Sequence, residues 1–307
     1  MKKLFLGLAL SIPALAAVAA DLPSRVAPPP AVPVFASFDA FASMAVGYNW
    51  GRMDFSSSKA DGLELQARGS FFAPLNAHFG APLNAHFGAQ VDGQFERSVY
   101  SSGVGSDFKK TTGELAGHAF WRDSKTGLVG VIAQASSTET SFGFLSDRRY
   151  FLGAEGQSFF GNFTLYGQAA YENVNFGVPM ASGVGADGFV GAAQLRYFVT
   201  PNLMIAAKGG YENIRTQNDA YAGLHHSAWL AGGKVEHRLS ASPLSLFAEA
   251  DYRSGQFNIG DLKEHETRAV VGVKVNFGSN TLIERDRSGA SLDPIRSLKA
   301  IVPYVLN

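Results

Sequence analysis

The sequence predicts an all-β protein, an antiparallel transmembrane β-barrel of about twelve strands, from three regularities. Segments of alternating apolar and polar residues recur along the chain, the connections between them alternate between short and long, and the charged residues inside the segments fall on one phase of the alternation. Side chains of a strand alternate between two faces, so each segment has an apolar face and a polar face. In a barrel that crosses a bilayer, the apolar face contacts lipid and the polar face lines the lumen.

The clearest segment is Thr267–Phe277, the last of the series. Its residues 269, 271, 273, 275 and 277 are all apolar, whereas the opposite phase carries Arg268, Lys274 and Asn276. This strand therefore has an apolar side and a polar side. The same pattern predicts strands at residues 43–50, 63–73, 85–96, 111–121, 128–136, 149–160, 163–173, 188–199, 203–214, 227–239 and 244–253.

The connections predict which end of the barrel faces which side of the membrane. Residues 122–127, 161–162, 200–202 and 240–243 form short links rich in turn-forming residues. The predicted links between them are longer, at residues 97–110, 137–148, 174–187, 215–226 and 254–266. Short periplasmic turns and longer extracellular loops are typical of bacterial transmembrane barrels, and an even strand count leaves both termini in the periplasm.

The chain divides into four predicted regions. Residues 1–20 have two lysines, an apolar run and small residues before Asp21, which indicates a secretory signal peptide. Residues 21–37 form a Pro-rich periplasmic leader, residues 38–277 the barrel, and residues 278–307 a periplasmic C-terminal tail. We expect the outer membrane of a Gram-negative bacterium, because the mature chain has no apolar run of the roughly 20 residues that a membrane helix needs.

Composition excludes several function classes. The chain has no cysteine, which removes thiol catalysis, a disulfide scaffold and cysteine-ligated zinc. Its 26 basic and 26 acidic residues balance, so no overall field attracts nucleic acid. No Gly-rich phosphate loop precedes a helix, and we expect no cofactor.

The inward charges are the candidate functional residues, and two interpretations of them stay open. They form either a narrow, weakly selective pore for passive diffusion of small solutes and ions, or ion pairs that fill a closed barrel with a structural or surface-interaction role. Barrels of about 8 strands are filled by side chains and those of 16–18 hold a channel, so about twelve strands do not decide between them. The predicted lumen-lining residues are Asp92, Glu96, Glu114, Glu155, Arg196, Lys208, Lys234, Glu236, Glu249, Asp251, Arg253, Arg268 and Lys274.

An eight-residue sequence, APLNAHFG, occurs twice in succession, at Ala73–Gly80 and Ala81–Gly88. Its histidines, His78 and His86, have no carboxylate or further histidine at ligand spacing beside them, so we expect no metal site. Proline and asparagine favour a bend, and the repeat is therefore interpreted as a local duplication at a periplasmic turn. Because eight is even, it preserves the in/out phase of the next strand.

The chain resembles the porin-like outer-membrane β-barrel proteins of alphaproteobacteria. The resemblance rests on the mature start ADLPSRVAPPPAVPVF, the first strand MAVGYNWG, the hairpin LRYFVTPNLMIAAKGGYE and the closing GVKVNF. It implies an outer-membrane location, contact with outer-membrane lipid, diffusion of small solutes or a surface role, and insertion by periplasmic chaperones and the barrel-assembly machinery. The insertion signal implied for the last strand is Val273, Val275 and Phe277, although about 30 residues follow Phe277 here, so the signal must be read internally.

An enzyme is the least favoured alternative. His225 and Ser227 resemble the His-x-Ser dyad of outer-membrane phospholipases, a class of lipid hydrolase. However, Ala228 and Trp229 replace the Asn-Gly that follows the serine in that family, and the sequence places no asparagine to orient the histidine, as triad geometry requires. His118 and His237 are single histidines, for which hydrogen-bonding roles are expected. We therefore expect no enzyme activity.

Overall fold

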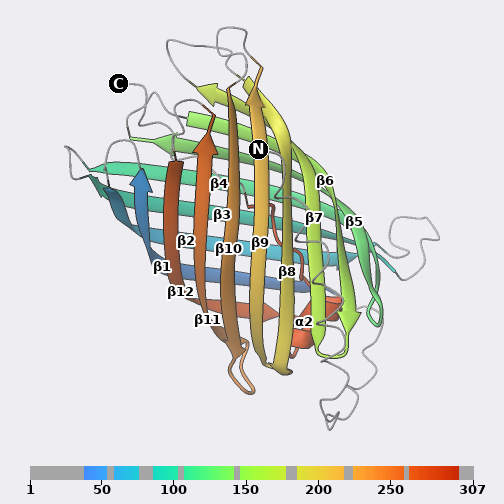
Figure 1. Cartoon of the computed structure of the whole chain (residues 1–307). Coiled ribbons are helices and arrows are strands. Elements are labelled where there is room, and N and C mark those ends of the chain that lie inside the picture. The colour runs from blue at the N-terminus through green and yellow to red at the C-terminus, as the bar shows by residue number, and fades with distance from the viewer. Residues whose placement is uncertain are drawn as a thin grey trace, which may run out of the picture. The chain divides into compact units, whose positions relative to one another are not determined.

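Twelve antiparallel strands close into a barrel in the computed structural model, which describes residues 38–53, 59–75, 86–102, 107–141, 146–177, 185–217, 224–258 and 263–296 (Figure 1). Each strand pairs with its neighbours in sequence, and β1 pairs with β12 to complete the ring, with Ala40 opposite Phe277. This confirms the predicted fold class and strand count. The strands are β1 (Asp39–Met53), β2 (Lys59–Pro74), β3 (Phe87–Ser102), β4 (Phe108–Asp123), β5 (Gly127–Thr140), β6 (Ser146–Phe160), β7 (Phe163–Gly177), β8 (Gly185–Thr200), β9 (Leu203–Thr216), β10 (His225–Arg238), β11 (Leu244–Phe257) and β12 (Lys263–Phe277).

The strands are longer than predicted, and the connections at one end are correspondingly shorter. Much of the predicted loop 97–110 is strand, because β3 and β4 stay paired as far as Tyr100 and Phe108. The ladder satisfies the backbone of these polar strand ends, so pairing continues beyond the apolar band. The connections at this end are residues 54–58, 103–107, 141–145, 178–184, 217–224 and 258–262. Those at the opposite end are 75–86, 124–126, 161–162, 201–202 and 239–243.

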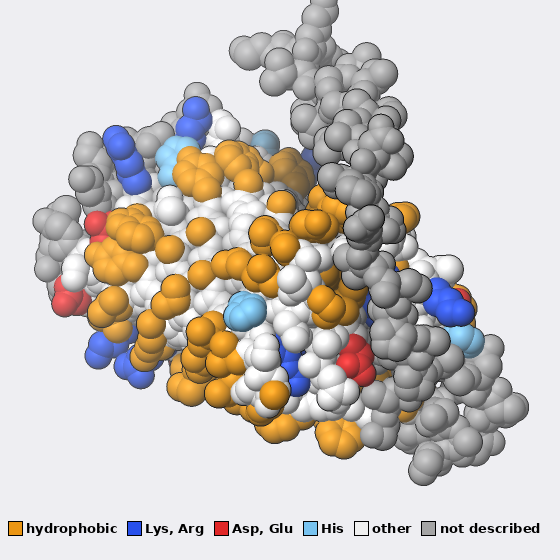
Figure 2. All heavy atoms as spheres, turned by 90° about the horizontal axis from the view of Figure 1, so that it is seen from below, with side chains coloured by type: hydrophobic (Ala, Val, Ile, Leu, Met, Phe, Trp, Pro, Cys, Tyr) orange, Lys and Arg blue, Asp and Glu red, His pale blue; other side chains and the backbone are white. Residues whose placement is uncertain are grey.

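The outer face of the barrel is apolar. Met44, Leu63, Leu152 and Phe189 are each at least 67% exposed, although they are large hydrophobic side chains. In Figure 2, hydrophobic side chains cover much of the visible face. A soluble protein rarely exposes so wide an apolar surface, whereas a lipid-facing band requires one.

Aromatic side chains stand on the outer face at both ends of the strands, as the alternation predicts. Trp50, Tyr150, Tyr211 and Trp229 are exposed toward the end that holds the connections 54–58 and 141–145. At the short-turn end, Phe71, Phe160 and Phe277 are exposed. Two such girdles mark the interfaces of a bilayer.

The described part of the predicted C-terminal tail, residues 278–296, packs inside the barrel. The chain turns at Gly278, whose φ of +101° favours glycine, and a short helix, α2 (Leu282–Ser288), follows. The backbone N–H of Leu282 donates to the carbonyl of Pro201 at 3.0 Å, so α2 lies at the short-turn end (Figure 1). No helix among the described residues is long and apolar enough to span a membrane.

The reason for this location is a set of apolar side chains on the inner wall near the short turns. Phe72, Phe120 and Leu128 point inward and are buried in one cluster with Leu292 of the tail. Further along, Ile295 is buried against inward apolar residues of the strands. Covering these side chains removes apolar surface from water, which stabilises the inserted position.

Some predictions lie outside the described residues. They are the signal peptide at residues 1–20, the leader at residues 21–37 and most of the duplicated APLNAHFG, including His78.

Candidate functional site in the barrel lumen

The candidate site consists of the inner wall of the barrel and of residues 278–296, the C-terminal segment. All thirteen predicted lumen-lining residues lie on the inner face, and most take part in ion pairs. Their part in solute passage stays a prediction. Glu96 and Glu114 line a cavity in the lumen, and Glu96 accepts a hydrogen bond from Gln66 at 3.1 Å.

One group of ion pairs lies on the β9–β12 side of the wall. Lys208 contacts Asp251 at 2.7 Å and Glu249 at 2.9 Å, and Arg268 contacts Glu249 at 2.8 Å. Arg268 also lies 2.7 Å from Glu64 of β2. Each cation thus has more than one carboxylate, which offsets the cost of removing these charges from water.

A second group surrounds Glu236, which is fully buried. Its carboxylate accepts hydrogen bonds from Lys274 and from Arg285 of α2, both at 2.8 Å, and lies 3.0 Å from Lys234. Three cations on one carboxylate tie β10, β12 and the C-terminal segment together.

The predicted single histidine His118 is buried between two of the predicted carboxylates. Its Nε2 lies 3.2 Å from Asp92 and its Nδ1 lies 2.8 Å from Glu155. Tyr166 donates its hydroxyl to the other oxygen of Glu155 at 2.8 Å. These contacts join β3, β4, β6 and β7, which is a structural role.

The wall binds the backbone of the C-terminal segment as well as its side chains. Gln90 donates to the carbonyl of Leu292 at 2.8 Å and accepts from its N–H at 3.2 Å, and Arg122 donates to the carbonyl of Gly289 at 2.7 Å. Gln168 donates to the carbonyl of Asp293 at 2.6 Å. Such bonds satisfy an extended backbone that has no sheet partner of its own.

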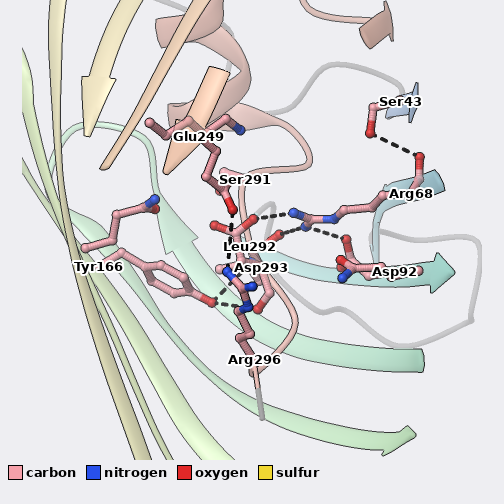
Figure 3. Close-up of polar contacts among 12 residues, drawn as sticks. Ser43, Arg68, Asp92, Tyr166, Glu249, Ser291, Leu292, Asp293 and Arg296 are labelled. Atoms are coloured by element: carbon pink, nitrogen blue, oxygen red, sulfur yellow. Dashed lines mark hydrogen bonds and ion pairs between the residues drawn. The ribbon is translucent and has the colours of Figure 1, made fainter. Parts of the chain in front are cut away.

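Asp293 of the segment lies between two basic side chains of the wall. One carboxylate oxygen accepts from Arg68 at 2.6 Å (Figure 3), and the other accepts from Arg196 at 2.8 Å. Burial alone would raise the pKa of Asp293, but Arg68, Arg196 and Lys234 hold this pKa well below its usual range. Asp293 is therefore an anion throughout the physiological range.

A cavity of about 150 Å³ remains beside the segment. Asp293 and Arg296 line it from the segment, and the wall contributes apolar and charged side chains from β1–β4 and β7–β12. The segment thus narrows the lumen and leaves a charged space near its middle. The charged residues that line this cavity are Arg68, Lys208, Lys234, Arg268, Lys274, Arg296, Glu96, Glu114, Glu249 and Asp293.

Sequence reasoning did not include Arg122 or the glutamines among the site residues. Arg122 was expected in a turn, whereas it is the last inward residue of β4 and is buried. The available signal was the row of inward aromatics near the short turns, such as Phe72 and Phe120, which a water-filled lumen would not favour.

The structure places an asparagine near the candidate His-x-Ser pair of the enzyme alternative, but these residues do not form a hydrogen-bonded triad. His225 and Ser227 share the outward phase of β10, as predicted, and Asn213 of β9 stands opposite Ser227, which corrects the expectation that no asparagine lies nearby. Within the described ranges, no hydrogen bond joins any two of these three side chains. Nor is any group of three or more His, Asp and Glu residues there arranged to hold a metal ion.

Comparison with known proteins finds similarity only in the fold. No family model matches the chain, and no curated protein matches it. An outer-membrane channel from Pseudomonas putida F1 superposes with a TM-score of 0.54 at 12% identity, over 82% of this chain and 100% of the channel. The translocator domain of the autotransporter NalP from Neisseria meningitidis has a TM-score of 0.49 at 15% identity, over 86% of this chain and 94% of that domain. The chain therefore has the fold of the outer-membrane β-barrels.

Proposed function

We propose that the protein is an outer-membrane channel through which small solutes diffuse passively, along the part of the lumen that the C-terminal segment leaves open. The observation that carries this proposal is the charged cavity of about 150 Å³ beside the segment. It is lined by residues of ten of the twelve strands, including strands on opposite sides of the ring, so it lies in the lumen and not within one wall.

Both signs of charge line the cavity, which supports weak selectivity. Six cationic and four anionic side chains give a formal charge of +2 around it. Most of these charges pair with one another across the wall, which leaves a modest net field for a passing ion.

A closed barrel with a structural or surface-interaction role is the second candidate. The observation that favours it is the C-terminal segment itself, whose Leu282, Leu292 and Ile295 are each at most 2% exposed within the lumen. In this alternative the ion pairs stabilise the barrel and no solute crosses.

The membrane and the assembly apparatus are the partners that we propose. The exposed apolar face suits outer-membrane lipid. Val273 and Phe277 stand on this face of β12, with Val275 between them on the same phase, so the proposed insertion signal is available to the barrel-assembly machinery and to chaperones. Recovery of the protein in the detergent-requiring outer-membrane fraction is expected; a soluble periplasmic pool would contradict this location.

Conductance across a planar bilayer tests the channel. We expect small discrete current steps from the full chain, and their absence in repeated preparations would favour the closed barrel. Glu114→Lys adds positive charge inside the cavity and should shift the reversal potential in a salt gradient toward anion preference. Glu139→Lys is the control, because Glu139 is exposed on the outer side of β5. If both variants leave the reversal potential unchanged, the current does not pass through this lumen.

A further inference from the structure

We propose that Arg68 and Arg196 form a carboxylate-binding site in the lumen, that Asp293 of the chain's own C-terminal segment occupies it, and that small carboxylate-bearing solutes compete with Asp293 for it. The inference rests on the proposed function only in that solutes must reach the lumen. It names the chemical class of those solutes.

The two arginines come from opposite sides of the barrel. Arg68 lies on β2 and Arg196 on β8, and these strands are six positions apart in a closed ring of twelve. Asp293 bridges them with one oxygen each, at 2.6 and 2.8 Å. A carboxylate is thus bound across the lumen, on the path that a solute would take.

Both guanidinium groups are positioned without help from Asp293. Arg68 donates to Asp92 at 3.0 Å (Figure 3), and its guanidinium stacks over Phe41, 5.1 Å from the ring centre. Arg196 donates to Gln194 at 2.6 Å and to Asp286 of α2 at 2.7 Å, and lies 5.1 Å from the ring centre of Tyr166. These partners hold both guanidinium groups in place without Asp293, so the site is preorganised for a carboxylate from another source.

The site opens onto the cavity. The side chain of Asp293 is 36% exposed, and it lines the cavity together with Arg68 and Lys234. Lys234 gives a second carboxylate of the same solute a cation nearby. A small dicarboxylate is therefore the ligand whose charges fit best.

Asp293 competes as a tethered ligand. Its covalent attachment gives it a high effective concentration at the two arginines, which weakens the apparent affinity for any free carboxylate. The apparent affinity should rise when this competitor is removed, as in Asp293→Ala.

Calorimetric titration of the full chain in neutral detergent with succinate tests the proposal, and succinamide serves as the uncharged analogue. We expect Asp293→Ala to bind succinate about tenfold or more tightly than the wild type, and neither protein to bind succinamide. Adding Arg196→Gln to the Asp293→Ala protein should abolish this gain in succinate affinity. Adding Lys208→Gln instead removes one cation from the same cavity but no partner of Asp293, and should leave the affinity within about threefold.

The heat-modifiable gel shift shows that each variant is folded. If Asp293→Ala fails to fold, Asp293→Asn, which removes the charge and keeps the shape, replaces it with the same expectations. If the folded Asp293→Ala protein does not bind succinate, the proposed site is wrong. The site is also wrong if adding Arg196→Gln and adding Lys208→Gln reduce the succinate affinity equally. The titration measures binding and not transport, so its outcome is separate from the conductance test. A barrel that binds succinate but conducts no ions contradicts only the channel function, and a barrel that conducts ions without binding succinate contradicts only the carboxylate site.

Discussion

Gln134 and Ile295 form two reciprocal hydrogen bonds, although 161 residues separate them. Gln134 donates to the carbonyl of Ile295 at 2.8 Å and accepts from its N–H at 2.7 Å. Gln90 binds Leu292 in the same way, three residues earlier in the segment. Gln134 lies at the middle of β5, so the segment reaches about halfway along the barrel, and the wall holds it there as it would hold a bound peptide.

Removing both glutamine side chains should loosen the segment. The chain has no native cysteine, so Ser291→Cys provides a single buried reporter for reaction with a maleimide. In Gln90→Ala/Gln134→Ala we expect labelling to be at least about fivefold faster, because four hydrogen bonds to the segment are lost, each worth about 0.5–1.5 kcal/mol. Gln94→Ala is the control, because Gln94 is also a glutamine of β3 but its side chain donates to Glu96 of the wall. Equal rates in all three proteins would show that the glutamines do not hold the segment.

Glu236 should be one of the most sensitive positions for stability. Glu236→Gln leaves Lys274, Lys234 and Arg285 without their shared carboxylate inside the barrel. Removing one partner of a buried ion pair lowers the free energy of unfolding by about 3–5 kcal/mol. We expect a clearly lower urea midpoint for loss of the heat-modifiable form, whereas Glu139→Gln on the outer surface should stay within about 0.5 kcal/mol of the wild type. Similar midpoints for the two variants would contradict this role.

The fold could be predicted from the sequence because a strand pattern repeats with a period of two residues. Each of the twelve strands carries that signal, and its apolar phase is fixed by contact with lipid, as in Leu63, Leu65 and Leu152. The strand ends could not be predicted as well. At Arg97 and beyond, pairing continues while the residues become polar, so hydropathy no longer distinguishes strand from loop.

The C-terminal segment could not be predicted because its position depends on pairs of residues far apart in the chain. Asp293 has no sequence signal that connects it with Arg68 and Arg196, and a charged tail after the last strand reads as solvent-exposed. Only the inward Phe72 and Phe120 indicated that something apolar must cover the wall.

Deleting one copy of the duplicated sequence should leave the barrel folded. β2 ends at Pro74 and β3 begins at Phe87, so removal of Ala73–Gly80 lets Ala81 and Pro82 take the places of Ala73 and Pro74. Only residues of the connection are then lost, and the in/out phase of β3 is preserved. We expect an unchanged heat-modifiable gel shift. Deleting Ala73–Gly88 is the contrast, because it leaves no residues for the turn; a single-copy variant that fails as this one does would refute the prediction.

The stability that Asp293 contributes should depend on pH in a defined direction. Its pKa in the folded protein lies below the ordinary value of 3.8, because Arg68, Arg196 and Lys234 outweigh the effect of burial. A carboxylate with a lowered pKa stabilises the folded state fully above its unfolded pKa, and this contribution disappears as the pH falls through the folded pKa. The difference in urea midpoint between the wild type and Asp293→Asn should therefore be constant from pH 7 to about pH 5 and shrink below about pH 4. Comparing the two proteins cancels the titration of the other carboxylates. A difference that already declines between pH 7 and about pH 5 would show that the two arginines do not hold Asp293 as an anion in the folded protein.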